Sequence, residues 1–251
     1  MSVTAIALVP ARAGSKRVPG KNQRTLADHP LLAYTVTAAL ESGVFASVVV
    51  STDSEQIAEI ARYYGAETPL LRPRELAEDL SPDIEWVEHV LLALRTQGHE
   101  YDAFSILRAT NPFRQAATIR RAWAEFLDER GVDSLRAVER CKQHPGKMWV
   151  VRGRRMQPLL PVQPEVQPWH STPYQALPEI YVQSAALEIA WSRVVWQGHT
   201  IAGTTIMPFF MSETESVDIN DPTDWARAER YAATPGTLPM ISKTPFSGSA
   251  S

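Results

Sequence analysis

A loop near the start of the chain combines glycines with cations at a spacing that suits phosphate binding. The apolar run from Ile6 to Val9 predicts a buried strand, and the loop follows it directly. The loop's glycines, prolines and cations are Pro10, Arg12, Gly14, Lys16, Arg17, Pro19, Gly20 and Lys21. Backbone N–H groups of such a loop, with cations beside them, neutralise phosphate charge at the carboxyl end of a first strand. We therefore expect a polyphosphate site here, and the alternative is a solvated basic turn.

The loop matches neither of the two commonest phosphate motifs. A P-loop needs Ser or Thr directly after its Gly-Lys pair, whereas Lys16 follows Ser15 and is itself followed by Arg17. A dinucleotide fingerprint, G-x-G-x-x-G, is absent from the sequence. A phosphate site in this chain must therefore be of another kind.

The segment from Leu8 to Asn22 resembles the signature of the nucleotide-sugar cytidylyltransferases, above all the acylneuraminate cytidylyltransferases. Their pattern, roughly L-x-P-A-R-x-G-S-K-x-[VLI]-P-x-K-N, is matched at every fixed position, and weaker resemblance continues to about Tyr231. The resemblance implies that Arg12 and Lys21 contact the triphosphate and are catalytic, and that Asn22 contacts the pyrimidine. The residues implied to cradle the phosphates are Ala11, Gly14, Ser15 and Lys16.

A second segment, Leu71 to Asp79, resembles the family's L-R-P-x-x-L-A-x-D element. There Arg72 is implied to bond the edge of the base, because a guanidinium offers a planar donor fork to the acceptors of cytosine. The alternative is that Arg72 only braces the turn before Pro73.

A metal site is implied by a third segment, Ser216 to Asn220, which resembles the family's S-[IV]-D-[IV]-[DN] element. Alternation along an expected strand places Asp218 and Asn220 on one face, where two oxygen ligands suit Mg²⁺ or Mn²⁺. Many relatives have Asp where this chain has Asn220, and an amide binds a cation more weakly. The alternative for Asn220 is to cap the helix that begins near Pro222.

The acceptor side matches the family less closely. Where sialic-acid enzymes read L-Q-P-T-S-P-L-R, this chain reads L-R-A-T-N-P-F-R, with Arg108 in place of Gln. An added charge and donor fork favour an anionic acceptor group, unless Arg108 pairs instead with Glu188 or Asp102. Tyr174 stands where those enzymes use an arginine for the carboxylate.

Two further acceptor-binding residues are expected from resemblance. Lys147, in an H-P-x-K element, is implied to hold a carboxylate or phosphonate, and Gln183 to contact the sugar. His144 of the same element is either a site residue or a hydrogen-bonded turn histidine.

Composition narrows the class of protein. The 251 residues carry a net charge of −3, which gives no basic excess for a nucleic-acid partner. No apolar run approaches the ~20 residues of a membrane span, and we expect no leader peptide. The single cysteine, Cys141, cannot form an intrachain disulfide, so we expect a cytoplasmic protein without membrane contact.

Alternating strand and helix patterns predict one α/β domain over 1–233. Strands are expected over 3–9, 46–51, 101–107, 182–191 and 200–207, and helices over 30–40, 55–64, 82–96, 116–130 and 223–233. This order favours a doubly wound, mostly parallel, Rossmann-like sheet, the GT-A-like nucleotidyltransferase fold. Ligands then bind outside the carboxyl ends of the strands.

Two parts of the chain depart from that pattern. Residues 141–180 are rich in proline and aromatics and contain an expected hairpin, 148–151 with 156–160. In the resembled family this region is a small β-rich dimerisation arm, which implies a homodimer. The tail, 234–251, is rich in Pro, Ser, Gly and Thr, and we expect it to be disordered.

Together these features predict a nucleotidyltransferase that moves CMP from CTP to an anionic acceptor and releases pyrophosphate. A nonulosonic acid such as sialic, legionaminic or pseudaminic acid is the first expectation for the acceptor. Related enzymes suggest 3-deoxy-octulosonate, a phosphonate or a sugar phosphate, or GTP as the nucleotide. A non-catalytic nucleotide-binding relative is the alternative from another class.

Overall fold

The computed structural model describes residues 3–161 and 167–247. The chain forms a body, Met1–Ala137 with Ser184–Ser251, and a smaller arm, Val138–Gln183. The arm expected over 141–180 falls within the second unit. In the part that the structure describes, no helix is long and apolar enough to cross a membrane.

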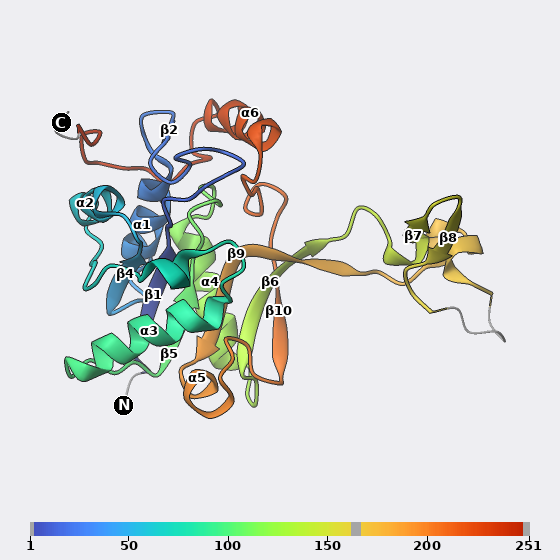
Figure 1. The fold of residues 1–251 in the computed structure, drawn as a ribbon, viewed down its shortest axis with the longest axis horizontal. Coiled ribbons are helices and arrows are strands. Elements are labelled where there is room, and N and C mark those ends of the chain that lie inside the picture. Colours follow the sequence, from blue (N-terminus) through green and yellow to red (C-terminus); the bar gives the residue numbers. More distant parts are fainter. Residues whose placement is uncertain (1–2, 162–166, 248–251) are drawn as a thin grey trace. The chain divides into compact units, whose positions relative to one another are not determined.

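A six-stranded sheet with the strand order β10-β6-β9-β5-β1-β4 organises the body (Figure 1). Strand β1, the neighbour of the edge strand β4, pairs in parallel with β4 and β5, and β5 pairs antiparallel with β9. The strands are β1 (Ala5–Pro10), β4 (Ser47–Ser51), β5 (Ala103–Ile106), β6 (Ser134–Arg140), β9 (Tyr181–Trp191) and β10 (Ile206–Phe210). Strands β1, β4 and β5 end at one edge, so the loops that follow them meet there.

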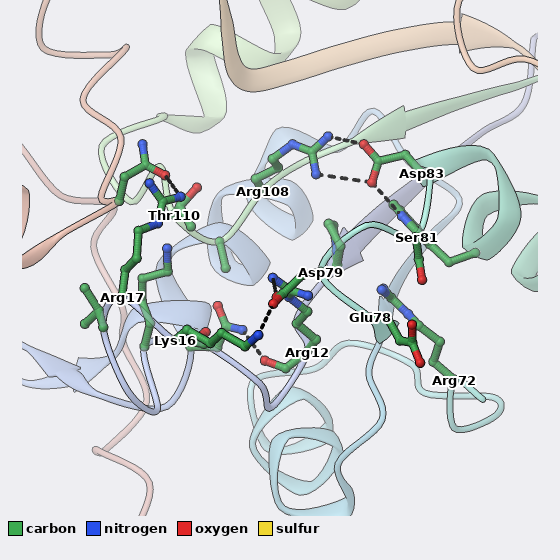
Figure 2. Close-up of a pocket in the computed structure, with 18 of the residues that line it drawn as sticks. Arg12, Lys16, Arg17, Arg72, Glu78, Asp79, Ser81, Asp83, Arg108 and Thr110 are labelled. Carbon is green, nitrogen blue, oxygen red and sulfur yellow. Dashed lines mark hydrogen bonds and ion pairs between the residues drawn. The ribbon is translucent and has the colours of Figure 1, made fainter. Parts of the chain in front are cut away.

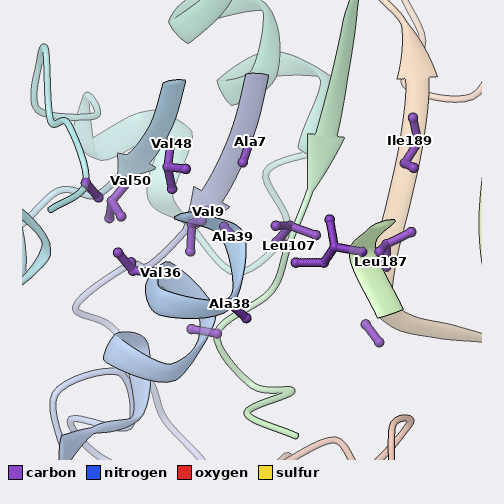
Figure 3. Packing of buried hydrophobic residues seen from close by; sticks show 14 of the residues in the cluster. Ala7, Val9, Val36, Ala38, Ala39, Val48, Val50, Leu107, Leu187 and Ile189 are labelled. Atoms are coloured by element: carbon purple, nitrogen blue, oxygen red, sulfur yellow. The ribbon is translucent and has the colours of Figure 1, made fainter. Parts of the chain in front are cut away.

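Helices cover both faces of this sheet. They are α1 (Leu31–Ser42), α2 (Glu55–Tyr63), α3 (Asp83–Thr96), α4 (Ala116–Asp128), α5 (Arg193–Gly198) and α6 (Pro222–Ala232). On one face, residues of α1, α2 and α4 pack with Ala7 and Val9 of β1 (Figure 3). On the other, residues of α3 and α5 pack with Ile6 and Leu8. Alternate residues of β1 thus pack into the hydrophobic cores on opposite faces of the sheet. The expected doubly wound fold is confirmed.

Local signals explain where the early helices begin and end. The Ser54 hydroxyl accepts a hydrogen bond from the N–H of Ile57 and so caps α2. Gly43 ends α1 at φ 64°, a left-handed conformation that glycine adopts without strain. A short hairpin, β2 (Thr25–Leu26) with β3 (His29–Pro30), precedes α1.

Several elements differ from the sequence-based expectations. Strand β6 and helix α5 were not expected, and the last strand is 206–210 rather than 200–207. Residues 216–220 are not a strand, because Ser216 ends a turn and 217–220 have no regular secondary structure. The cap of α6 is Asp221, which accepts hydrogen bonds from the N–H groups of Thr223 and Asp224, so the capping role considered for Asn220 is wrong.

The end of the chain contacts the body where the composition favoured disorder. Over 234–247, the structure places the Phe246 side chain against the core, and the Phe246 N–H donates to the Tyr64 hydroxyl at 3.1 Å. The Tyr63 hydroxyl donates to the carbonyl of Thr244 at 2.9 Å. Residues 248–251 of the expected disordered tail lie outside the described residues.

The arm contains the expected hairpin, formed by β7 (Trp149–Arg152) and β8 (Arg155–Pro158). Three short 3-10 turns, η2 (Pro145–Lys147), η3 (Trp169–Ser171) and η4 (Tyr174–Ala176), complete it. Gly146 is tightly enclosed, because a Cβ there would lie 2.7 Å from the Cβ of Trp169. This small unit therefore has its own packing.

Candidate active site

The basic loop is fixed to the carboxyl end of β4. The Ala11 N–H donates to the carbonyl of Ser51 at 3.0 Å, and the Ala13 N–H donates to a carboxylate oxygen of Asp53 at 2.8 Å. The Asn22 amide closes the loop by donating to the carbonyl of Arg12 at 3.0 Å. Backbone contacts thus hold the loop and leave its long cationic side chains available.

A cavity of about 300 Å³ opens beside this loop (Figure 2). Six cations line it, namely Arg12, Lys16, Arg17, Lys21, Arg72 and Arg108. Three carboxylates also line it, namely Glu78, Asp79 and Asp83. Although the whole chain is acidic, this cavity has an excess of positive charge and suits a polyanion.

Arg12 and Lys16 share one acidic partner. Arg12 Nη2 lies 2.8 Å from Asp79 Oδ1, and Lys16 forms an ion pair with the other oxygen of that carboxylate. Arg12 Nη1 also donates to the carbonyl of Ala77 at 3.3 Å. Two of the cations expected to meet phosphate therefore share a single exposed carboxylate.

Lys21 is more enclosed and points toward the segment that carries the expected metal ligands. Its Nζ donates to the carbonyl of Ile219 at 2.7 Å. Burial lowers the pKa of Lys21, and the negative charge of Asp218 partly opposes that shift. The loop and the metal segment are thereby joined at the edge of the cavity.

The side chains of Asp218 and Asn220 are in contact, although the strand that was expected to place them on one face is absent. The Asn220 amide nitrogen donates to Asp218 Oδ2 at 2.6 Å. The other oxygen, Asp218 Oδ1, is buried and has no hydrogen-bond partner among the described residues. No group of three or more His, Cys, Asp or Glu side chains suited to a metal occurs in the described ranges. One carboxylate and one amide nevertheless fit Mg²⁺, which takes its remaining ligands from water and phosphate.

The metal segment is held by the loop that follows β5. The Ile219 N–H donates to the carbonyl of Thr110 at 2.9 Å, and the Asn111 amide donates to the carbonyl of Val217, also at 2.9 Å. The ligands are therefore positioned without a strand, by hydrogen bonds between loops.

The guanidinium of Arg72 braces the end of β4 and also lines the cavity. Its Nε donates to the Ser51 hydroxyl at 3.0 Å, and its Nη2 donates to the Ser51 carbonyl at 2.9 Å. The guanidinium also stacks over the ring of Trp86, with its Cζ 4.8 Å from the ring centroid. Burial lowers the pKa of Arg72 to about 10. Two of the three guanidinium nitrogens of Arg72 are therefore bonded to Ser51, as the bracing alternative predicts. A contact between Arg72 and the base stays a prediction.

Arg108 lies in a partly buried charge network at the other end of the cavity. Its guanidinium pairs with Asp83 in the first turn of α3 (Figure 2). It also lies 3.3 Å from Glu188 Oε1. Glu188 also pairs with Arg136. Burial opposes charge on Arg108, but its two carboxylate partners outweigh burial and raise its pKa. The pairing with Glu188 considered from sequence is present, whereas Asp102 bonds Thr4.

Arg114 is a fully buried cation beneath the acceptor-side loop. It donates to the carbonyl of Ala186 and to the Thr35 hydroxyl, and its Nη2 lies 3.4 Å from the Arg108 carbonyl. Burial lowers its pKa to about 9, and Asp218 opposes the shift. Arg114 therefore supports the loop that carries Arg108.

The cavity brings together most of the expected nucleotide residues. Of those, Arg12, Ser15, Lys16, Lys21, Asn22 and Arg72 line it, as do Arg108 and Asn220. Gly14 lines a neighbouring cavity, and Ala11 is buried below the loop. These assignments remain predictions for contacts with a ligand.

Three expected acceptor residues belong to the arm. The Lys147 ammonium donates to the carbonyls of His170 and Thr172, at 3.0 and 2.5 Å. The Tyr174 hydroxyl donates to the carbonyl of Lys142 at 3.1 Å, and Gln183 is exposed. His144 takes the turn role, since its Nδ1 accepts from the Gly146 N–H at 2.9 Å. Contacts of these residues with an acceptor stay predictions.

Sequence reasoning gave no role to several residues of the site. Those residues are Asp53, Asp79, Asp83, Arg114 and Arg136. The final Asp of the L-R-P-x-x-L-A-x-D segment and the final Arg of the L-R-A-T-N-P-F-R segment were available signals for Asp79 and Arg114. The partners of the other three depend on tertiary contacts.

Comparison with known proteins identifies the family. A family model described as cytidylyltransferase matches residues 6–144. The chain is 36% identical to the CMP-N,N'-diacetyllegionaminic acid synthase of Legionella pneumophila, over 90% of this chain and 94% of that protein. It is 34% identical to a pseudaminic acid cytidylyltransferase of Campylobacter jejuni, over 53% of this chain and 58% of that one.

A solved structure agrees with the fold. The structure of CMP:2-keto-3-deoxy-manno-octonic acid synthetase complexed with CTP superposes with a TM-score of 0.66 at 16% identity, covering 92% of this chain and 98% of that one. The loop signature, the doubly wound sheet and the family match agree, and the chain belongs to the cytidylyltransferase family.

Proposed function

We propose that this protein transfers CMP from CTP to a hydroxyl oxygen of a nonulosonic acid and releases pyrophosphate. The observation that carries the proposal is the convergence of three segments on one cationic cavity. These are the signature loop, the Arg72 segment and the loop that holds Arg108 and supports Asn220. Family membership and 36% identity to a legionaminic acid synthase over almost the whole chain support the same activity.

In the proposed reaction the acceptor oxygen attacks the α-phosphorus in line, and the bond to pyrophosphate breaks. Arg12 and Lys21 stabilise the charge that develops on the phosphate oxygens, because fixed cations in a partly enclosed site act strongly on such charge. Asn22 and Arg72 would face the base from the two loops that border the cavity.

A divalent cation, Mg²⁺ or Mn²⁺, fits this reaction. Asp218 and Asn220 would hold it, and the unpartnered Asp218 Oδ1 supports that role. When bound, the cation neutralises charge on the triphosphate and the leaving pyrophosphate. Since this chain has an amide at Asn220, one metal ion is the simpler proposal.

An anionic acceptor fits Arg108, which lines the cavity while paired with Asp83. The relatives' printed substrates, legionaminic and pseudaminic acid derivatives, are acids of this kind. The exposed apolar residues of the arm support a homodimer, and they include Trp149, Val151, Met156, Leu159 and Trp169. A cytoplasmic location also stays a prediction.

A pyrophosphate-release assay tests the proposal. CTP, UTP, ATP and GTP are each combined with Mg²⁺ and with legionaminate, pseudaminate, N-acetylneuraminate, 3-deoxy-octulosonate, a phosphonate or a sugar phosphate. Release only with CTP and a nonulosonic acid is the expected result. Release with another acceptor would keep the enzyme class and replace the substrate. CTP binding without release from any pair would favour a non-catalytic nucleotide-binding protein.

A further inference from the structure

The carboxylate of Asp79 pairs with two cations of the signature loop, and the proposed reaction gives Asp79 no role. Its two carboxylate oxygens each take one cation, Arg12 at 2.8 Å and Lys16 on the other side (Figure 2). The three side chains remain partly exposed, with 38% of Asp79, 34% of Arg12 and 82% of Lys16 accessible. The contact is therefore open to solvent and to an incoming ligand.

A carboxylate that bridges an arginine and a lysine makes the same contacts that a phosphate would make. Both groups present negatively charged oxygens to the donor fork of a guanidinium and to an ammonium. Arg12 and Lys16 are two of the residues that the signature loop offers to a triphosphate. Asp79 and a triphosphate cannot both take the same N–H donors.

The segment that carries Asp79 also divides the space available to a ligand. A second cavity of about 910 Å³ lies next to the first one. Five residues line both cavities, namely Arg12, Lys16, Arg72, Glu78 and Asp79. The Arg12–Asp79 pair thus lies where the two cavities adjoin.

We propose that Asp79 is an internal competitor of the triphosphate, which holds the loop cations until the nucleotide displaces it. The inference rests on the proposed function in one respect only, that the loop binds polyphosphate. Exposed ion pairs are weak, so displacement is easy. If the free loop is open about 10–30% of the time, the apparent affinity for polyphosphate falls by a factor of roughly 3–10.

The pairing of Asp79 with Arg12 and Lys16 also competes with the product pyrophosphate. Pyrophosphate leaves the cations that the triphosphate held, and Asp79 returns to them. Removing the carboxylate therefore strengthens product inhibition by pyrophosphate by the same factor as it strengthens triphosphate binding. If Asp79 only ordered the cations for the substrate, its removal would instead weaken both triphosphate binding and inhibition by pyrophosphate.

Titration calorimetry at fixed ionic strength with the full-length protein tests the proposal. The probes are CTP and inorganic tripolyphosphate, which lacks a base. The variants are Asp79→Asn, Asp79→Glu and Glu78→Gln. Glu78 is the matched control, since it is the adjacent carboxylate, lines both cavities and makes no ion pair with the described part of the chain. Thermal unfolding checks that each variant is folded.

Asp79→Asn is expected to bind both probes roughly 3–10-fold more tightly, while Glu78→Gln changes by less than about 2-fold and Asp79→Glu stays closer to the wild type. Weaker binding by Asp79→Asn, or equal gains in Asp79→Asn and Glu78→Gln, overturns the competitor role. If CTP does not bind but tripolyphosphate binds more tightly to Asp79→Asn, the inference stands and the CTP assignment fails. If neither probe binds any form, both fail.

Discussion

The two ends of the cavity handle positive charge differently. At the nucleotide end, Arg12 and Lys16 share one exposed carboxylate, Asp79. At the acceptor end, Arg108 is paired with two carboxylates, Asp83, which is partly buried, and Glu188, which is buried. A weakly neutralised group of cations binds a highly charged ligand, whereas a closely paired cation selects a ligand by geometry. The comparison predicts that the first end binds the triphosphate and that the second end discriminates among acids.

The largest effect is expected from the nucleotide end. Arg12→Ala and Lys21→Ala should each lower turnover on the order of 10²–10⁴-fold, because each removes a cation that stabilises transition-state charge. Pyrophosphate release measures the loss. Lys16→Ala is the matched comparison, since its side chain is 82% exposed, and it should lose much less. Near-wild-type rates for Arg12→Ala or Lys21→Ala would remove the phosphate assignment.

The metal segment should show the next largest effect. Asp218→Ala should lower turnover by about 10²-fold at limiting Mg²⁺, since it removes the only carboxylate of the pair. Asn220→Asp should lower the Mg²⁺ concentration needed for half-maximal rate, because a second charge strengthens the site. Rates titrated against Mg²⁺ give both results. An unchanged metal requirement in both variants would leave this pair a structural element.

At the acceptor end, substitution of Arg108 should change the KM for the acceptor. Arg108→Gln should raise the KM for the acceptor about 10-fold and leave the KM for CTP unchanged, since it removes a charged hydrogen bond. Arg136→Gln is the control, because Arg136 pairs with the same Glu188 but is not among the residues that line the cavity. Arg136→Gln should lower thermal stability with little change in acceptor KM. Equal acceptor KM values in the two variants would make Arg108 structural.

A smaller, few-fold effect is expected from pH. Burial lowers the pKa of Lys21 below its ordinary 10.5, so its charge is lost as pH rises through that lowered value. The pH profile of kcat/KM should therefore fall on the alkaline side, below pH 10.5. Lys21→Arg keeps its charge to higher pH and should move that fall upward. An alkaline limb that is identical in the variant would assign the titration to another group.

The sequence predicts the nucleotide end of the cavity well, because the signals for its strands, helices and loops lie in short stretches of neighbouring residues. The apolar runs, the Ser54 cap and the glycine ends of helices define the strands and helices that bring the loops after β1 and β4 to one edge. The same edge gathers Arg12, Lys21 and Arg72. Periodicity and a long contiguous motif were sufficient for this much.

The remainder depends on contacts between distant parts of the chain. Arg108 meets Asp83, 25 positions away, because α3 begins beside the end of β5. The segment around Asp218 is not a strand, and Thr110 and Asn111, more than 100 positions earlier in the chain, hold it by hydrogen bonds. Helix α5 has only six residues, too few for a periodic signal, and the C-terminal residues pack through single side chains such as Phe246.

The hydrogen bond from Lys21 to Ile219 has a consequence for synthesis on the ribosome. Its two residues are 198 positions apart. At about 5–20 residues per second, the loop is made roughly 10–40 seconds before its partner segment exists. A nascent chain therefore carries a cationic loop without Asp218, and it is not yet competent to activate a nucleotide. In the proposed reaction, catalytic competence therefore arises only after the segment around Asp218 has been synthesised.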